Sequence, residues 1–175
     1  IFFPDTYYFI KGSSDLDILQ RAYKTMQNHL QNYWSERVES LPLNTPYEAL
    51  ILASIIEKET GAESDRAEIA GVFINRLRKG MKLQTDPTVN YGLVEQFDGK
   101  LRKKDLLADQ EYNTYTRAGL PPTPISLPSL ASIRAALNPA ETDALYFVAK
   151  GNGESEFSTN LADHNKAVNK YQKHQ

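Results

Sequence analysis

The sequence predicts an α+β fold, in which several helices pack on a small antiparallel sheet and a long loop-rich region carries the active site. Three observations lead to this prediction. Apolar residues recur every three or four positions in the first half, this rhythm is lost over Met81–Pro128, and two short β-prone runs near the C-terminal end flank a glycine-rich turn. With 175 residues, of which 41% are apolar and 24% charged, residues 1–175 are expected to form a single catalytic domain.

The N-terminal half is expected to hold one strand and three helices. The opening segment Phe2–Ile10 is rich in aromatic residues and predicts a strand. Thr45 and Pro46 are a typical cap and first residue of a helix, and Gly61 is a typical residue after a helix end. The expected helices are Asp15–Ser40, Pro46–Thr60, and a third that Ser64 or Asp65 caps and that ends at Arg78.

The C-terminal half begins with the irregular region and returns to regular structure after it. Short strands are predicted at Lys82–Thr85 and Val89–Tyr91, within a stretch that otherwise reads as loops. The later pattern predicts, in order, a helix at Ser129–Leu137, strands at Ala144–Ala149 and Glu156–Ser158, and a closing helix at Asn160–Gln175.

Composition excludes several functions. The net charge of −2 and the pI near 6.0 provide no basic field for nucleic acid. No cysteine is present, the histidines are scattered, and we expect neither a metal nor a cofactor. His164 is expected to be a surface or capping residue. No apolar run approaches the roughly 18 residues of a membrane helix. The chain opens without methionine, and we expect it to be a fragment of a longer protein.

The stretch LILASIIEKETGAESD places two glutamates at the end of the most apolar segment. On a helical wheel of ~100° per residue, Glu57 falls beside Ser54 and Lys58 on the polar side, where we expect a solvated charge. Glu59 falls within the apolar arc. Burial raises the pKa of a carboxyl, so Glu59 can hold a proton near neutral pH and donate it to the leaving oxygen of a glycosidic bond.

The wheel alone favours a different reading of Glu59, in which it is a buried structural carboxylate. Arg66 and Arg76 are available to pair with it, and ion pairs of this kind also bury glutamates. Two further motifs, LQTDPTVNYG and YNTYTRAGLPPTPI, are equally open. Their hydroxyls, amides and tyrosine rings suit a sugar-binding rim, and turn chemistry or loop packing would explain the same residues.

Five strings, taken together, resemble the endolytic murein (lytic) transglycosylases of the MltG/YceG-like family over nearly the whole chain. They are FFPDTYYF, ASIIEKET, VFINRLRKGMKLQTDPTVNYG, YNTYTRAGLPPTPI and LYFVAKGNGESEFSTNLADHN. The resemblance implies that Glu59, the glutamate before threonine in Glu-Lys-Glu-Thr, is catalytic. It implies cleavage of the β-1,4 bond between N-acetylmuramic acid and N-acetylglucosamine without water. Glu59 would act first as acid and then as base, leaving a 1,6-anhydro end.

The resemblance also implies which residues bind the substrate, where the protein is located and which proteins it acts beside. The expected substrate-binding residues are Gln84, Thr85, Asp86, Thr88, Tyr91, Asn113, Thr114, Tyr115 and Leu120. A membrane anchor and a LysM-like segment are implied ahead of this domain, with action on the periplasmic side of the inner (cytoplasmic) membrane beside peptidoglycan synthases. Two alternatives stay open: a hydrolase that uses Glu59 with Asp86, and a non-catalytic glycan-binding or scaffold module.

Overall fold

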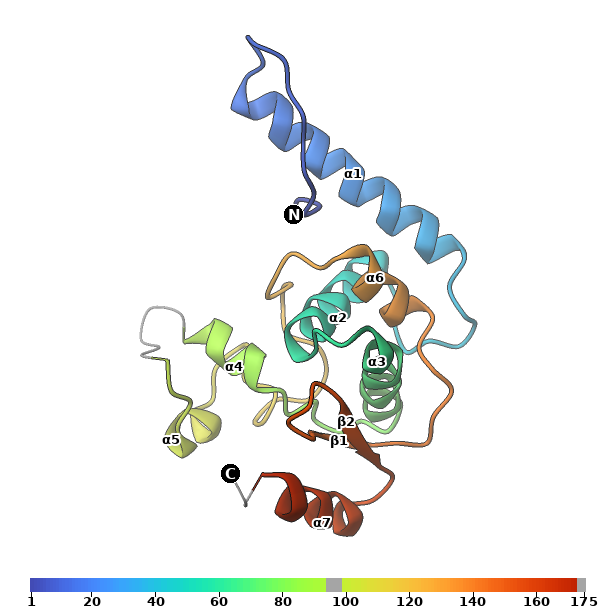
Figure 1. Cartoon of the computed structure of the whole chain (residues 1–175), viewed down its shortest axis with the longest axis vertical. Coiled ribbons are helices and arrows are strands. Elements are labelled where there is room, and N and C mark those ends of the chain that lie inside the picture. Colours follow the sequence, from blue (N-terminus) through green and yellow to red (C-terminus); the bar gives the residue numbers. More distant parts are fainter. Residues whose placement is uncertain (94–98, 173–175) are drawn as a thin grey trace.

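The computed structural model describes residues 1–93 and 99–172, and its helices and strands confirm the predicted α+β class (Figure 1). In chain order, the elements of this part are α1 (Asp15–Ser35), α2 (Pro46–Glu59), α3 (Glu63–Arg78), α4 (Asp86–Gly92), α5 (Lys103–Leu107), α6 (Leu130–Leu137), β1 (Tyr146–Ala149), β2 (Ser155–Ser158) and α7 (Leu161–Tyr171). None of the helices in the described ranges is long and apolar enough to cross a bilayer.

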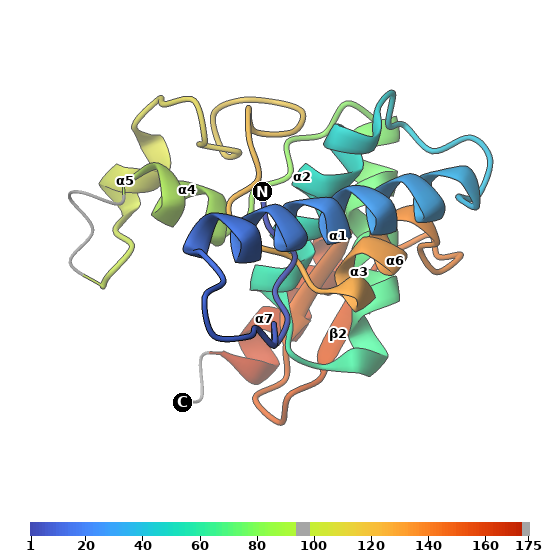
Figure 2. The same cartoon turned by 90° about the horizontal axis from the view of Figure 1, so that it is seen from above.

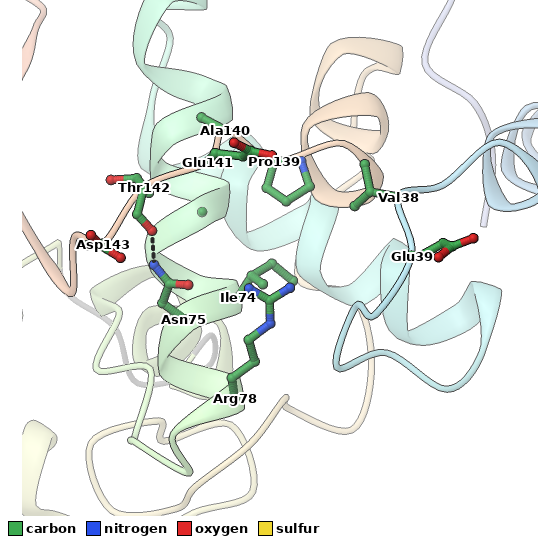
Figure 3. A pocket seen from close by; sticks show the side chains of 11 residues that line it. Val38, Glu39, Ile74, Asn75, Arg78, Pro139, Ala140, Glu141, Thr142 and Asp143 are labelled. Atoms are coloured by element: carbon green, nitrogen blue, oxygen red, sulfur yellow. Dashed lines mark hydrogen bonds between the residues drawn. The ribbon is translucent and has the colours of Figure 1, made fainter.

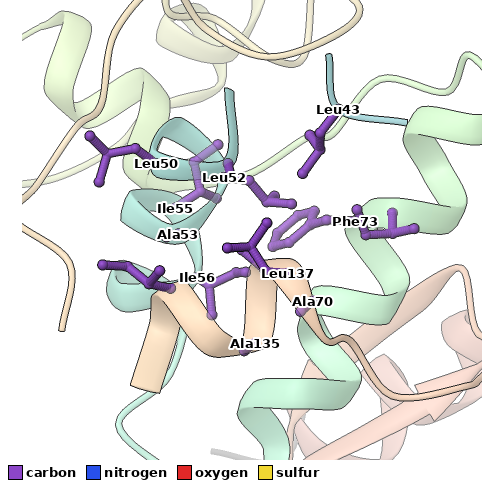
Figure 4. Close-up of a cluster of buried hydrophobic side chains, with 14 of the residues drawn as sticks. Leu43, Leu50, Leu52, Ala53, Ile55, Ile56, Ala70, Phe73, Ala135 and Leu137 are labelled. Carbon is purple, nitrogen blue, oxygen red and sulfur yellow. The ribbon is translucent and has the colours of Figure 1, made fainter. Parts of the chain in front are cut away.

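The core lies among helices, with α2 at its centre. Every residue of 49–56 is buried, and α2 packs against α1, α3 and α6 (Figures 1 and 2). Figure 4 shows Ile55 and Ile56 of α2 in one cluster with Phe73 of α3 and Leu137 of α6. The polar side expected for α2 is wrong at Ser54, which is buried with the rest of residues 49–56, whereas Lys58 is exposed as expected. Ser54 is fully buried, and its hydroxyl accepts a hydrogen bond from the Ile125 amide at 2.9 Å.

The two strands form an antiparallel hairpin at one end of the helical core. The register pairs Tyr146 with Ser158 and Ala149 with Ser155. Phe147 of β1 meets Phe73 of α3 edge-on, with ring centroids 5.8 Å apart, and α7 packs against both strands. The hairpin therefore joins α7 to the core beside α3, as Figure 1 shows.

The prediction of a strand at 2–10 is wrong. The segment runs back along α1, where the Phe3 amide donates to the Ala22 carbonyl at 3.0 Å, and it joins no sheet in the described chain (Figure 1). An aromatic run becomes a strand only where another strand completes its hydrogen bonds.

The predicted helix ends differ in three places. α1 ends at Ser35 because the Arg37 side chain bonds the Trp34 carbonyl at 2.7 Å and the Val38 amide bonds α6 at 3.1 Å. After α2 the chain turns extended at Thr60, so Gly61 does not provide a left-handed cap. α3 begins at Glu63, and its cap position is Ala62, two residues before Ser64 and three before Asp65, with no side-chain cap.

The two strand predictions in the irregular region are also wrong. Val89–Tyr91 lies within α4, whose first turn contains Pro87, and 82–85 pairs with no other strand in the described part. Proline suits a first helical turn, and a helix of seven residues is too short to show periodicity. The later elements are confirmed in order and type: Ser129 caps α6, both strands form, with β1 starting at Tyr146 and not at Ala144, and Asn160 caps α7. α7 ends at Tyr171, before the predicted end at Gln175, and residues 173–175 lie outside the described residues.

Replacement of Gly71 by alanine is expected to lower the free energy of unfolding by about 1–3 kcal/mol. A Cβ at this position of α3 would lie 2.7 Å from Thr142 Cγ2 and 2.8 Å from the Ala140 carbonyl oxygen. The Ala140 amide bonds the Ala67 carbonyl at 2.9 Å, so the backbone cannot retreat freely. Urea unfolding measures the effect. Gly61→Ala is the control, since its Cβ meets no atom within 4 Å, and equal losses for both variants would contradict the clash.

Candidate active site

A cavity of about 520 Å³ lies at the C-terminal end of α2. One side consists of Glu59, the last residue of α2, and of residues 84–86 with Tyr115. The other side is formed by β1 and α7, which lie next to α3, on the side away from α1 (Figure 1). The lining residues from the hairpin and α7 are Tyr146, Phe147, Val148, Ala149, Ser155, Leu161, His164, Asn165, Val168 and Gln172. The cavity therefore combines parts of the chain that are about a hundred residues apart.

The Glu59 carboxyl is partly buried, and its pKa is raised. Burial is the main cause, because it disfavours the ionised form, and the negative charge of Asp86 acts in the same direction. The Thr85 hydroxyl donates a short hydrogen bond to Glu59 Oε1, which opposes the shift and fixes the position of the carboxyl. The protonated form of Glu59 therefore persists to higher pH than in water, as a general acid requires.

Neither arginine considered from the sequence pairs with Glu59 within residues 1–93 and 99–172. Arg76 donates to the carbonyl oxygens of Leu145 at 2.7 Å and Leu83 at 2.9 Å. The charge of Arg66 acts instead on Glu57, whose pKa it helps to lower. In the described structure the Glu59 carboxyl faces a cavity and is not closed into an ion pair.

Asp86 and Tyr115 form the second polar pair of the cavity. The Tyr115 hydroxyl donates to Asp86 Oδ1 at 2.5 Å. Burial raises the pKa of Tyr115, and the charges of Asp86 and Glu59 raise it further, so the phenol stays protonated and remains a donor. Asp86 begins α4, and the Thr85 amide is fixed by Thr114 Oγ1 at 3.1 Å. Gln84 precedes it with a positive φ of 52°, a conformation that the surrounding bonds must maintain.

Three of the expected substrate-binding residues are buried and support the loops instead of lining the cavity. The Thr88 hydroxyl donates to the Thr85 carbonyl and lies 2.8 Å from that of Thr114. The Asn113 amide donates to three carbonyl groups around α5, including that of Ala108 at 2.7 Å. These side chains hold Thr85 and the Tyr115 loop in place.

Two other expected residues lie outside this cavity. The exposed Tyr91 packs against the Tyr112 ring, with centroids 4.9 Å apart. Leu120 lines a separate depression beside Pro42 and Tyr47. Of the ten residues selected from the sequence, the structure thus brings five together on the cavity: Glu59, Gln84, Thr85, Asp86 and Tyr115.

Glu57 is not the solvated charge that the wheel predicts. Its Oε2 atom accepts hydrogen bonds from the Ser129 amide at 2.9 Å and from the hydroxyls of Ser129 and Ser132, both at 2.6 Å. Burial opposes ionisation, but these bonds and the charge of Arg66 outweigh it and lower the pKa of Glu57. Glu57 therefore links the end of α2 to the first turn of α6.

His164 is the cavity residue that sequence reasoning assigned to the surface. Its ring stacks on Tyr146, with centroids 5.1 Å apart and planes at 25°. Arg76, expected only as an ion-pair partner, also lines the cavity and lies over the Tyr146 ring at 5.0 Å. The helical pattern predicts that His164 lies on a helix. It cannot predict that His164 lines the cavity, because α7 reaches this position through its contact with the hairpin.

A second cavity, of about 580 Å³, lies on the opposite side of α3 (Figure 3). Asn75 lies at the edge of this cavity, and its side-chain amide donates a hydrogen bond to the Thr142 carbonyl at 2.6 Å. Arg78 and Glu141 also line the cavity. It contains none of the residues selected from the sequence. As for metals, the part of the chain that the structure describes holds no cluster of three or more histidine, aspartate or glutamate side chains able to bind an ion.

Comparison with known proteins identifies relatives of this chain. It is 44% identical over 170 residues to an endolytic murein transglycosylase of Bacillus subtilis (strain 168), covering 97% of this chain and 46% of the relative. It is 34% identical over 177 residues to an endolytic murein transglycosylase of Streptococcus pneumoniae (serotype 2, strain D39), covering 95% of this chain and 31% of the relative. The chain thus spans less than half of the length of either.

A solved structure agrees with these sequence matches. The crystal structure of a YceG-like protein of Listeria monocytogenes superposes with a TM-score of 0.82 at 43% sequence identity, covering 94% of this chain and 53% of that one. Residues 1–170 match the YceG-like family model. The Glu-Lys-Glu-Thr string, the cavity beside it and these matches lead to one assignment: the chain belongs to the YceG-like family.

Proposed function

We propose that residues 1–175 form the catalytic domain of an endolytic peptidoglycan lytic transglycosylase, with Glu59 as its acid and base. The observation that carries the proposal is the Glu59 carboxyl, which lines a cavity with its pKa raised by burial. The names of the two relatives, endolytic murein transglycosylases, support the reaction class. The substrate is the glycan strand of peptidoglycan, cut at the β-1,4 bond between N-acetylmuramic acid and N-acetylglucosamine.

The reaction needs one proton donor that becomes a proton acceptor. Glu59 protonates the leaving glycosidic oxygen as the bond to the muramyl anomeric carbon breaks, and the substrate's acetamido group stabilises the cationic carbon. The Glu59 carboxylate then takes the proton of the muramyl C6 hydroxyl, whose oxygen bonds the anomeric carbon and closes the 1,6-anhydro ring. Glu59 is thus protonated again, by the proton of the C6 hydroxyl, and no water enters. Thr85 keeps the carboxyl in place through both steps.

The other expected binding residues take two roles in this proposal. Gln84, Asp86 and Tyr115 contact the glycan from the cavity wall. Thr88, Asn113 and Thr114 act by supporting that wall, whereas Tyr91 and Leu120 lie outside the cavity. This wall offers the amide of Gln84 and the hydroxyls of Thr85 and Tyr115 beside two carboxyl groups, which suits a ligand rich in hydroxyl groups.

The reaction products test the proposal directly. Purified sacculi treated with the protein are expected to release fragments with 1,6-anhydromuramic ends, identified by mass spectrometry. Reducing ends would instead indicate hydrolysis, in which water attacks the anomeric carbon. That alternative is favoured by one observation, since Asp86 lines the same cavity and its charge acts on Glu59.

Asp86→Asn separates the two reactions further. The charge of Asp86 raises the pKa of Glu59, so its removal is expected to shift the alkaline limb of the pH–rate profile toward lower pH. The sign follows because a general acid works only while protonated, below its pKa. Anhydro products should continue to form. Complete loss of the reaction at every pH would support the two-carboxylate hydrolase.

The location and partners are proposed from what the family resemblance implies. This domain would act on the periplasmic side of the inner membrane, held there by an anchor in the rest of the protein. It would act beside peptidoglycan synthases and limit the length of nascent strands. Crosslinking in intact cells, followed by identification of the captured proteins, tests the partnership.

A further inference from the structure

The side of the cavity formed by β1 and α7 has no part in the proposed chemistry. Its polar and aromatic residues include Tyr146 from β1, and His164 and Asn165 from α7. A sugar bound beside Glu59 would lie between this side and the wall that contains Thr85 and Asp86. Sugar binding requires neutral hydrogen-bonding groups in fixed positions, so the orientation of these side chains matters.

The plane of the His164 ring is fixed by a chain of contacts. It stacks on Tyr146 at 5.1 Å, and the Arg76 guanidinium lies 5.0 Å from the centre of the same tyrosine ring. Arg76 is fixed in turn by the Leu145 and Leu83 carbonyl groups, at 2.7 and 2.9 Å. A side chain positioned before the ligand arrives loses little freedom on binding, which favours affinity.

The imidazole of His164 has hydrogen-bonding capacity that the described residues leave unused. Nδ1 is enclosed and has no hydrogen-bond partner among them. Burial lowers the pKa of His164, and the charge of Arg76 lowers it further, so the ring is neutral in neutral solution. A neutral imidazole offers one N–H donor and one acceptor nitrogen. Because Nδ1 is enclosed, a ligand in the cavity would meet the other nitrogen, Nε2.

We infer that His164 contacts the bound glycan, through a hydrogen bond between Nε2 and a hydroxyl or acetamido group of a sugar ring, and that Asn165 borders the same ring. This inference rests on the proposed function for the identity of the ligand. It assigns His164 to substrate binding and leaves proton transfer to Glu59. The competing reading is that the ring only packs on Tyr146.

The test measures binding separately from catalysis. In a Glu59→Gln background, a soluble tetrasaccharide of alternating N-acetylglucosamine and N-acetylmuramic acid is titrated by calorimetry. His164→Ala is expected to weaken binding about tenfold, the effect of losing one hydrogen bond and its stacking contact. His164→Gln should recover part of the loss, because an amide can still donate and accept. In the active protein, His164→Ala should raise KM more than it lowers kcat.

His29→Ala is the matched control, since His29 also packs on an aromatic ring, Phe3, at 4.6 Å, but on α1 and outside the cavity. Both alanine variants should lose similar thermal stability, and only His164→Ala should lose binding. Equal binding by His164→Ala and its parent, or no binding by the parent, would overturn the inference. Anhydro products without an effect of His164 would overturn it and leave the proposed function intact. Binding that depends on His164, with no cleavage by the wild type, would support the inference and overturn the proposed function.

Discussion

Glu59→Gln is expected to lower the rate of anhydro-fragment release by roughly 10²–10⁴-fold, the range that a general acid contributes. The amide has the shape of the carboxyl but cannot give a proton to the glycosidic oxygen. Thr85 can still donate its hydrogen bond to the amide oxygen, so the geometry at the end of α2 should be retained. Initial rates on purified sacculi, with fragments counted by mass spectrometry, measure the loss.

The same substitution should not destabilise the protein. Burial raises the pKa of Glu59 above its ordinary value of 4.5, so the native state binds this proton more tightly than the unfolded chain does. The resulting stabilisation is complete below the unfolded pKa and is lost as the pH rises through the folded value. A neutral amide removes this dependence. Glu59→Gln should therefore melt at or above the wild-type temperature in neutral buffer.

Glu63→Gln is a suitable control, because Glu63 is an exposed glutamate at the start of α3. It should keep both the rate and the melting temperature of the wild type. Release of fragments by Glu59→Gln at the wild-type rate would remove Glu59 from the reaction and favour a scaffold or glycan-binding module. Loss of release together with unfolding would show that Glu59 has a structural role.

The parts of the fold that sequence predicted correctly are those with local causes. Ser129 caps α6 and Asn160 caps α7 through bonds to residues three positions ahead, and Thr45 and Pro46 begin α2 in the same way. The segment 2–10 has a strand-like composition, but a strand depends on a partner elsewhere in the chain. α4 was missed because seven residues are too few to show a period.

In the candidate site, too, features with local causes were predicted from the sequence, and features that depend on distant contacts were not. The helical wheel separates Glu59 from Glu57 by their angles, and Glu59 does reach the cavity. The wheel contains no information on residues outside α2. It therefore predicts that Glu57 is exposed to water, although Ser129 donates hydrogen bonds to it. His164 was missed for the same reason, since its contact with Tyr146 depends on how the hairpin closes onto α7. Contacts between distant parts of the chain are decided by packing, which a single periodicity does not contain.

The neighbouring substitution, Glu57→Gln, is expected to have the opposite outcome to Glu59→Gln. It should lower the free energy of unfolding by roughly 1–2 kcal/mol, because the amide oxygen still accepts these bonds but without the charge that strengthens them, and the side chain is only partly buried. One oxygen of Glu57 accepts bonds from both Ser129 and Ser132, so the loss affects the start of α6. Folded molecules should still cleave glycan. Urea unfolding and rates per folded molecule measure the two effects.

The pH dependence of this loss identifies its cause. The pKa of Glu57 is lowered from an ordinary value of 4.5, so the unfolded chain binds its proton more tightly than the native state does. Its contribution to stability is present above the unfolded pKa and disappears as the pH falls through the folded one. The difference between wild type and Glu57→Gln should therefore be large in neutral buffer and shrink in acid. A difference that is equal at both pH values would mean that packing at the α2–α6 contact, and not hydrogen bonding to an ionised carboxylate, stabilises this junction.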